Sequence, residues 1–194
     1  MQSNLKHLFS PLTLRGHKLK NRIFSTGHMA VMLENGKPTD AMVAYHEAKA
    51  RGGAALTIIE AARVHPSGNS GRPSIKAYQQ DTIPGYAKLA NACHPHGCKV
   101  FAQLTHPGRE MTMAADGSHA VAYAPSTVPN ERFHVMPRAM SISLIEEVIE
   151  GFETSARNLQ NAGIDGVEIV AIVCDFQGVS PGSLVGADTK VRNT

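Results

Sequence analysis

The sequence predicts an α/β protein built on a parallel sheet, and two observations carry this prediction. Four short, nearly continuous apolar runs recur along the chain, as expected for strands covered on both faces, and segments with helical spacing of apolar residues separate them. This alternation fits either a doubly wound sheet or a (β/α)8 barrel. The stretch "RIFSTGHMAVMLENG", which contains the first run, has neither the glycine-rich turn nor the phosphate loop of a doubly wound nucleotide fold. The barrel is therefore favoured.

The apolar runs place four strands, and a hairpin precedes them. The strands are predicted at 22–26, 54–64, 99–106 and 166–171. Ahead of the first, "LTLRGHKLKN" alternates apolar and polar residues on either side of its Arg-Gly-His centre, which predicts a small β-hairpin. A hairpin in this position can close the bottom of a barrel.

Three helices are predicted between the strands. The first two lie over 39–53, with Thr or Asp at its start, and over 81–97. The third helix follows residue 142 and has the clearest pattern, because Ser143 and Glu146 are spaced as a capping box. Its apolar residues are spaced to line one face: Ile145, Val148, Ile149, Phe152, Ala156 and Leu159.

The connection between the third strand and the third helix, residues 106–141, is too long for a simple connector. It contains several turn-forming residues, so we expect a functional loop at the carboxyl end of the third strand. The predicted order of elements is thus β-α-β-α-β-α-β with right-handed crossovers.

Composition and charge exclude several classes of protein. The chain has 194 residues, 42% of them hydrophobic, and a net charge of +3 from 19 basic and 16 acidic side chains. The basic residues are scattered, which argues against a nucleic-acid partner. No apolar run is long enough to span a membrane, and "MQSNLKHLFSPLT" lacks the features of a signal peptide. Three cysteines make no disulfide framework, so a cytoplasmic location and no membrane partner are expected.

The segment "CHPHGC" invites comparison with a metal site. It places Cys93, His94, His96 and Cys98 within six residues, but no second ligand pair of the kind that completes a zinc site is evident elsewhere. The Pro and Gly inside it are typical of a helix end, where imidazoles also favour the negative end of the helix dipole. We therefore predict no metal site.

Six stretches of the sequence form an ordered set of motifs: "LFSPLTLRGHKLKNRI", "YHEAKARGGAALTIIEAARVHPSG", "IPGYAKLANACHPHGCKVFAQLTHPGR", "APS", "MS" and "NAGIDGVEI". The combination of Leu-Lys-Asn-Arg-Ile, the Arg-x-Gly-Gly strand entry and Gln-Leu-x-His-x-Gly-Arg, in that order and spacing, is highly specific. In these motifs the chain resembles the Old Yellow Enzyme, or NADH:flavin oxidoreductase, family of FMN-containing (β/α)8 barrels, and it resembles the demethylase and dienoyl-CoA reductase branch most.

The resemblance implies an FMN site at the carboxyl ends of the barrel strands, with NAD(P)H as electron donor. It places Thr26 at the N5–O4 edge of the flavin, with Gly27 and His28 beside it, and Ala61 packed near the isoalloxazine. It also places Gln103 at the pyrimidine ring, where an amide can both donate and accept hydrogen bonds. The substrate that the resemblance implies is a small organic molecule.

Two polar residues of the third motif are not assigned to catalysis. His106 and Arg109 belong to the Gln-Leu-x-His-x-Gly-Arg motif, and we expect them to shape the loop after the third strand. Met29 stands where many relatives carry a redox-tuning cysteine, so no thiol is expected to tune the flavin here.

The substrate-binding residues of the family are missing after the fourth strand. Relatives carry His-x-x-His or His-x-x-Asn there, whereas this chain has Val170 and Val173, which cannot donate a side-chain hydrogen bond to a substrate oxygen. Asp175 stands where relatives carry a tyrosine that often donates a proton. No catalytic residue is therefore predicted.

The remaining sequence does not supply four more strands. Residues 1–171 are expected to form the amino-terminal half of the barrel, truncated after its fourth strand, and 172–194 an irregular tail that a frameshift could explain. A βα unit needs about 30 residues or more, which the tail cannot provide. The open barrel edges are expected to favour self-association.

Two functions from different classes follow. The first is an FMN-dependent oxidoreductase that transfers hydride between NAD(P)H or a substrate and the flavin. The alternative is a catalytically inactive fragment, or an interaction module, descended from such an enzyme.

Overall fold

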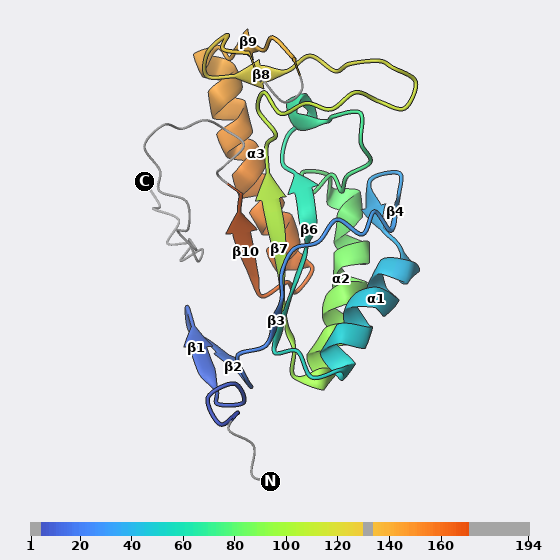
Figure 1. The fold of residues 1–194 in the computed structure, drawn as a ribbon, viewed down its shortest axis with the longest axis vertical. Coiled ribbons are helices and arrows are strands. Elements are labelled where there is room, and N and C mark those ends of the chain that lie inside the picture. The colour runs from blue at the N-terminus through green and yellow to red at the C-terminus, as the bar shows by residue number, and fades with distance from the viewer. Residues whose placement is uncertain (1–4, 130–133, 171–194) are drawn as a thin grey trace.

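A computed structural model describes residues 5–129 and 134–170 of the chain, and Figure 1 shows their arrangement. One sheet of four parallel strands dominates the fold. Each strand pairs with the strands of this sheet that come before and after it in the sequence. This order has no reversal, whereas a doubly wound sheet reverses at its switch point. The α/β prediction is confirmed, and the order matches successive strands of a (β/α)8 barrel. The strands are β3 (Phe24–Ser25), β6 (Leu56–Arg63), β7 (Lys99–Thr105) and β10 (Gly166–Ile169).

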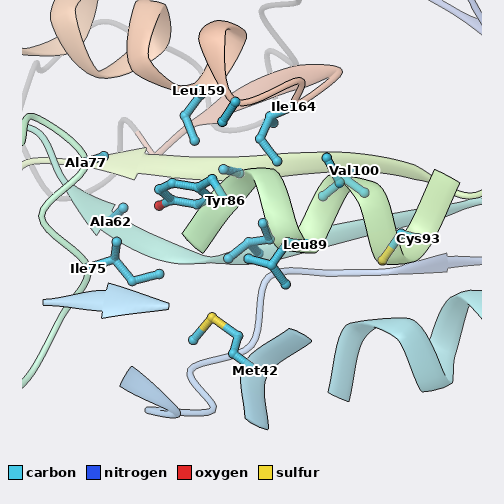
Figure 2. Close-up of a cluster of buried hydrophobic side chains, with 14 of the residues drawn as sticks. Met42, Ala62, Ile75, Ala77, Tyr86, Leu89, Cys93, Val100, Leu159 and Ile164 are labelled. Atoms are coloured by element: carbon cyan, nitrogen blue, oxygen red, sulfur yellow. The ribbon is translucent and has the colours of Figure 1, made fainter. Parts of the chain in front are cut away.

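Three helices cover one face of this sheet: α1 (Asp40–Arg51), α2 (Ile83–Cys93) and α3 (Ile142–Asn161). Their buried residues form one core with alternate residues of the strands, because successive side chains of a strand point to opposite faces. Figure 2 shows Tyr86 and Leu89 of α2 in this core together with Met42 of α1 and Leu159 of α3.

The opposite face carries a second, smaller core that includes the predicted hairpin. The hairpin consists of β1 (Leu12–Leu14) and β2 (His17–Leu19), and both residues of its turn have positive φ, as a tight type I′ turn requires. Leu19 packs with Leu56 and Phe101 of the sheet. Figure 1 shows the hairpin below the amino-terminal ends of the strands, so the predicted position at the bottom of the sheet is confirmed.

The start of α3 differs from the prediction. The capping residue is Ser141, whose Oγ accepts the Leu144 N–H at 3.1 Å, and Ser143 already lies in the first turn. The predicted apolar face was also one residue too wide, since Ile149 is 63% exposed. Val148 and Leu159 are buried as predicted.

The connections hold several short elements. A hairpin of β4 (Leu33–Glu34) and β5 (Lys37–Pro38) precedes α1, and 3-10 turns flank α2, so the helix predicted over 81–97 is a composite. Within the long loop, β8 (Tyr123–Ala124) and β9 (Arg138–Ala139) pair in parallel. Figure 1 shows them beyond the carboxyl end of β7, where the loop was predicted.

Part of the predicted chain lies outside the described residues. This applies to Val173, Cys174, Asp175 and the expected tail 172–194. Among the described residues, no helix is long and apolar enough to cross a membrane.

Candidate functional site

The candidate site lies at the carboxyl ends of the sheet strands. These ends meet at one edge of the sheet because the four strands are parallel. Thr26, Gly27 and His28 follow β3 directly, Ala61 lies near the end of β6, and Gln103 lies near the end of β7. The fold therefore brings all five sequence-predicted residues to the same edge, although they come from three separate segments.

Gly27 and Gln103 lie in close approach. A Cβ atom added to Gly27 would lie 2.5 Å from both Cδ and Nε2 of the Gln103 amide, and 2.8 Å from its Oε1. No side chain fits in that space, so a glycine is needed for the amide to occupy its present position. Glycine is needed here because of space and not because of backbone conformation, since the φ of Gly27 lies outside the left-handed region.

The Gln103 amide has a partner on the neighbouring strand that the sequence did not reveal. Its Nε2 donates a hydrogen bond to Oε1 of Glu168 at 2.8 Å, and the two residues face each other in the β7–β10 pairing. The one available signal was strand alternation, which puts facing residues of paired strands on the same side of a sheet.

A β-bulge shapes the sheet beside this pair. The register of β6 against β7 shifts between Ile59 and Ala62, so Glu60 and Ala61 together lie opposite Gln103. Bulges bend a strand and re-aim its side chains, and they are frequent beside active sites. The bulge thus sets the position of Ala61, the small residue predicted to pack near the flavin.

Glu60 holds the loop that carries the residues after β3. Its Oε2 accepts the backbone N–H groups of Ala30 and Val31 at 2.7 and 2.9 Å. Val31 has φ +54, an unusual conformation for a β-branched residue, so its loop needs such an anchor. Glu60 is 1% exposed, and its Oε1 has no hydrogen-bond partner in the part of the chain that the structure describes. This role was also missed, although a lone carboxylate in the apolar run "AALTIIEAARV" was a visible signal.

The site suits a planar ring with mixed donors and acceptors better than it suits a phosphate. Gln103 offers both a donor and an acceptor, Gly27 leaves the space that this amide occupies, and Thr26 is exposed. None of the five predicted residues is Lys or Arg, and His28 is the only one of them that can carry a positive charge. The residues therefore fit the isoalloxazine ring of FMN rather than its phosphate.

His106 is built into a hydrogen-bonded chain next to the site. Its Nδ1 accepts the Gly108 N–H at 3.1 Å, so its Nε2 donates to Ser67 Oγ at 3.0 Å. Ser67 Oγ in turn lies 2.7 Å from Nδ1 of His65. Burial, together with the charges of His65 and Arg63, lowers the pKa of His106 to about 4, so the ring is neutral near pH 7.

Arg109 bonds within the long loop. Its Nη1 donates to the backbone carbonyls of Val128 and Pro129 at 3.4 and 3.3 Å. These contacts, and those of His106, agree with the prediction that both residues shape the loop after the third strand.

The two histidines of "CHPHGC" have different partners, and neither contacts a cysteine of the segment in an ion pair or hydrogen bond. Both cysteines are buried, His94 Nε2 lies 2.7 Å from Asp165 Oδ2, and His96 Nε2 lies 3.6 Å from Glu47 Oε1. Within 5–129 and 134–170, no group of three or more His, Cys, Asp or Glu residues could hold a metal ion.

Comparison with known proteins gives a consistent result along most of the chain. Residues 7–173 match the NADH:flavin oxidoreductase / NADH oxidase family. A metal reductase of Desulforamulus reducens is 34% identical over 165 residues, which are 84% of this chain and 24% of that protein. An NADPH dehydrogenase of Bacillus subtilis is 30% identical, over 86% of this chain and 48% of its own length. A multifunctional alkene reductase/demethylase of Caballeronia cordobensis is 31% identical, over 83% of this chain and 24% of its own length.

Solved structures show the same fold. A 2-naphthoyl-CoA reductase in complex with 2-naphthoyl-CoA superposes with a TM-score of 0.76 and 26% identity, over 87% of this chain and 27% of that one. Morphinone reductase in complex with tetrahydroNAD has a TM-score of 0.74 at 24% identity, over 86% of this chain and 50% of that one. The chain thus spans between about a quarter and a half of the proteins that it matches.

Proposed function

The chain belongs to the NADH:flavin oxidoreductase / NADH oxidase family, and from this we propose that it contributes to an FMN-dependent oxidoreductase that passes hydride from NAD(P)H to a small organic substrate. FMN is the cofactor that family membership implies, with NAD(P)H as the electron donor. In this proposal, residues 1–171 supply the first four strands of the barrel, and the protein works in the cytoplasm.

The observation that carries the proposal is the arrangement of Gly27 against Gln103 at the carboxyl edge of the sheet. Bound FMN would supply the hydride chemistry, and the protein would bind and orient its ring. Gln103 would hold the pyrimidine part of the ring through its amide, and Gly27 would leave the space in which this amide lies. Thr26 would contact the N5–O4 edge, with His28 beside it, and Ala61 would leave room for the ring.

Glu60 supports this arrangement without touching the ring. Its two bonds to the backbone of Ala30 and Val31 fix the loop that follows Thr26 and Gly27. Rigid support of this kind keeps binding groups in their productive geometry.

A flavin-binding experiment tests the proposal. The purified chain is mixed with FMN, and bound flavin is measured by its visible absorbance and by its bleaching on addition of NAD(P)H. Gln103→Ala is expected to weaken FMN binding by about tenfold, as expected for loss of a hydrogen-bonding amide. Gln160→Ala removes the same group from an exposed position on α3 and should leave binding unchanged. A colourless chain that takes up no FMN would contradict the proposal.

The second candidate is a catalytically inactive relative or an interaction module. Val170 favours it, because this residue stands where family resemblance places a substrate-binding histidine, and its backbone N–H continues the sheet to the Leu104 carbonyl at 3.0 Å. FMN binding without any bleaching by NAD(P)H would support this second candidate over the first.

A further inference from the structure

The pair formed by Gln103 and Glu168 carries an inference about how the ring would be recognised. The two residues face each other on β7 and β10, and Gln103 Nε2 lies 2.8 Å from Glu168 Oε1. Both side chains are partly exposed at the carboxyl edge of the sheet. Glu168 is therefore next to the candidate site, and it is not among the five residues proposed above to contact the flavin.

The chemistry of the pair fixes the direction of the amide. The oxygen and nitrogen of a glutamine amide are distinguished by their hydrogen-bond partners, and an ionised carboxylate can only accept. The NH2 group of Gln103 must therefore face Glu168, and its Oε1 is left to accept a bond from elsewhere. Gly27 packs against one side of the amide from the loop after β3, so the amide has little space on that side.

We propose that Glu168 is a positioning residue, which holds the Gln103 amide in one orientation so that its Oε1 and its second N–H face the flavin pyrimidine ring. The ring presents an imide there, an N–H flanked by two carbonyl groups, and one orientation of the amide matches this pattern. A reversed amide would put its donor against the ring N–H. The inference rests on the proposed FMN function and adds a residue that acts through Gln103.

The alternative role of Glu168 is structural, as a cross-strand pair that stabilises the β7–β10 pairing. The substitution Glu168→Gln separates the two roles. A glutamine keeps the size of the side chain and can still bond across the strands, but it both donates and accepts, so it no longer selects one orientation of Gln103. Glu146→Gln removes the same charge from an exposed position of α3 and serves as the matched control.

The first measurement is FMN affinity, followed by quenching of flavin fluorescence on titration with the full chain. We expect Glu168→Gln to raise the dissociation constant of FMN by about tenfold. The substitution exchanges a hydrogen bond to a charged carboxylate for one to a neutral amide, which can pair with the Gln103 amide in either of its two orientations. Glu168→Gln should add little when Gln103→Ala is already present, because a residue that acts through Gln103 has no effect without it. Equal effects in both backgrounds would overturn the inference.

The second measurement needs no flavin. The side-chain N–H signals of Gln103 in the NMR spectrum of the ¹⁵N-labelled chain should show one strongly hydrogen-bonded proton, and Glu168→Gln should shift these signals while Glu146→Gln leaves them in place. Unchanged signals in Glu168→Gln would overturn the positioning role. An unaltered chain that binds no FMN would overturn the proposed function and the ligand named here, while the Gln103 signals would still show whether Glu168 orients the amide.

Discussion

At the scale of single residues, Gly27 sets the space available to the Gln103 amide. We predict that Gly27→Ala displaces this amide, because the new Cβ would lie 2.5 Å from its Cδ and Nε2. The clash involves the mobile end of a side chain, so the free energy of unfolding should change by less than about 1 kcal/mol. FMN affinity, measured by fluorescence quenching, should fall by about tenfold. Unaltered affinity would show that the position of the amide does not matter for binding.

The pKa values of two buried imidazoles lead to a second prediction at this scale, on how stability depends on pH. Burial lowers the pKa of His106 to about 4, and burial together with the charge of Lys49 lowers that of His46 to about 4. The unfolded chain, with histidine pKa values near 6.5, binds protons that the folded chain does not. The free energy of unfolding should therefore be unaffected above pH 6.5, fall as the pH decreases from 6.5 to 4, and fall no further from this cause below 4.

Urea unfolding at a series of pH values measures this effect. A pKa shift of this size corresponds to on the order of 3 kcal/mol per imidazole. His106→Asn should remove about half of the loss between pH 6.5 and 4, because His46 still titrates. The same pH slope in His106→Asn and in the unaltered chain would contradict the prediction.

The individual residues of the site could be predicted only in part. Gln103 and Gly27 belong to motifs that family resemblance assigns, and the structure brings them into contact. Glu168 lies 65 positions from Gln103 in the chain, and no local pattern indicates which side chain a strand residue meets across a sheet. The partners of Glu60 could not be predicted either, because they are backbone N–H groups, which every residue except proline carries.

At the scale of elements, helix α3 approaches the end of β6 very closely. A Cβ atom added to Gly151 would lie 2.4 Å from the backbone oxygen of Val64. Gly-to-Ala changes within an exposed helix stabilise it by up to about 1 kcal/mol. Here we predict the opposite sign, because neither backbone can yield without moving the helix.

Gly151→Ala should lower the free energy of unfolding by about 1–3 kcal/mol, as overpacking does in other cores. Chemical denaturation measures it, with Glu150→Ala as a control at the adjacent, exposed position of the helix. A more stable Gly151→Ala chain would show that α3 can move away from β6.

The four strands of the sheet, the β1–β2 hairpin and the three helices were predictable, whereas the ends of these elements and the short strands β4, β5, β8 and β9 were not. Apolar periodicity arises because one face of an element is buried along its whole length, so the pattern identifies the element without fixing its ends. The beginning of α3 depends on a single hydrogen bond, and Ser141 and Ser143 are chemically identical candidates for it. Ile149 shows the same limit, because an apolar residue at the margin of a helix face can be exposed without breaking the pattern.

At the scale of the whole molecule, the sheet ends in two strands with one neighbour each among the described residues, β3 and β10. Apolar side chains are exposed near these strands: Phe24 is 41% exposed, Met29 42% and Ile169 41%. Uncovered strand edges and apolar surface favour association with another chain. We therefore predict that the isolated chain of 194 residues self-associates.

Sedimentation velocity over a range of protein concentrations measures this association. Ile169→Lys places a charge on the edge strand and should shift the distribution toward the monomer while leaving the far-UV circular dichroism unchanged. A monomer at every concentration would contradict the prediction.

The overall architecture was predictable because a barrel imposes a simple rule on the sequence. Alternating strands and helices without a glycine-rich nucleotide turn favoured the barrel, and the order β10-β7-β6-β3 agrees with it. The exposure of Phe24, Met29 and Ile169 beside the sheet edges could not be predicted, because it depends on packing that no motif within residues 8–169 describes.

The sequential order of the sheet also bears on how the protein is made. A ribosome delivers the chain from its amino end, and β6, β7 and β10 each pair with the strand of the same sheet that precedes them in the sequence. Each of these pairings therefore closes a connection of one helix with its loops and short hairpins, and among the described strands of the sheet none waits for a later part of the chain to be synthesised. The fold can assemble in step with translation, one strand and one helix at a time.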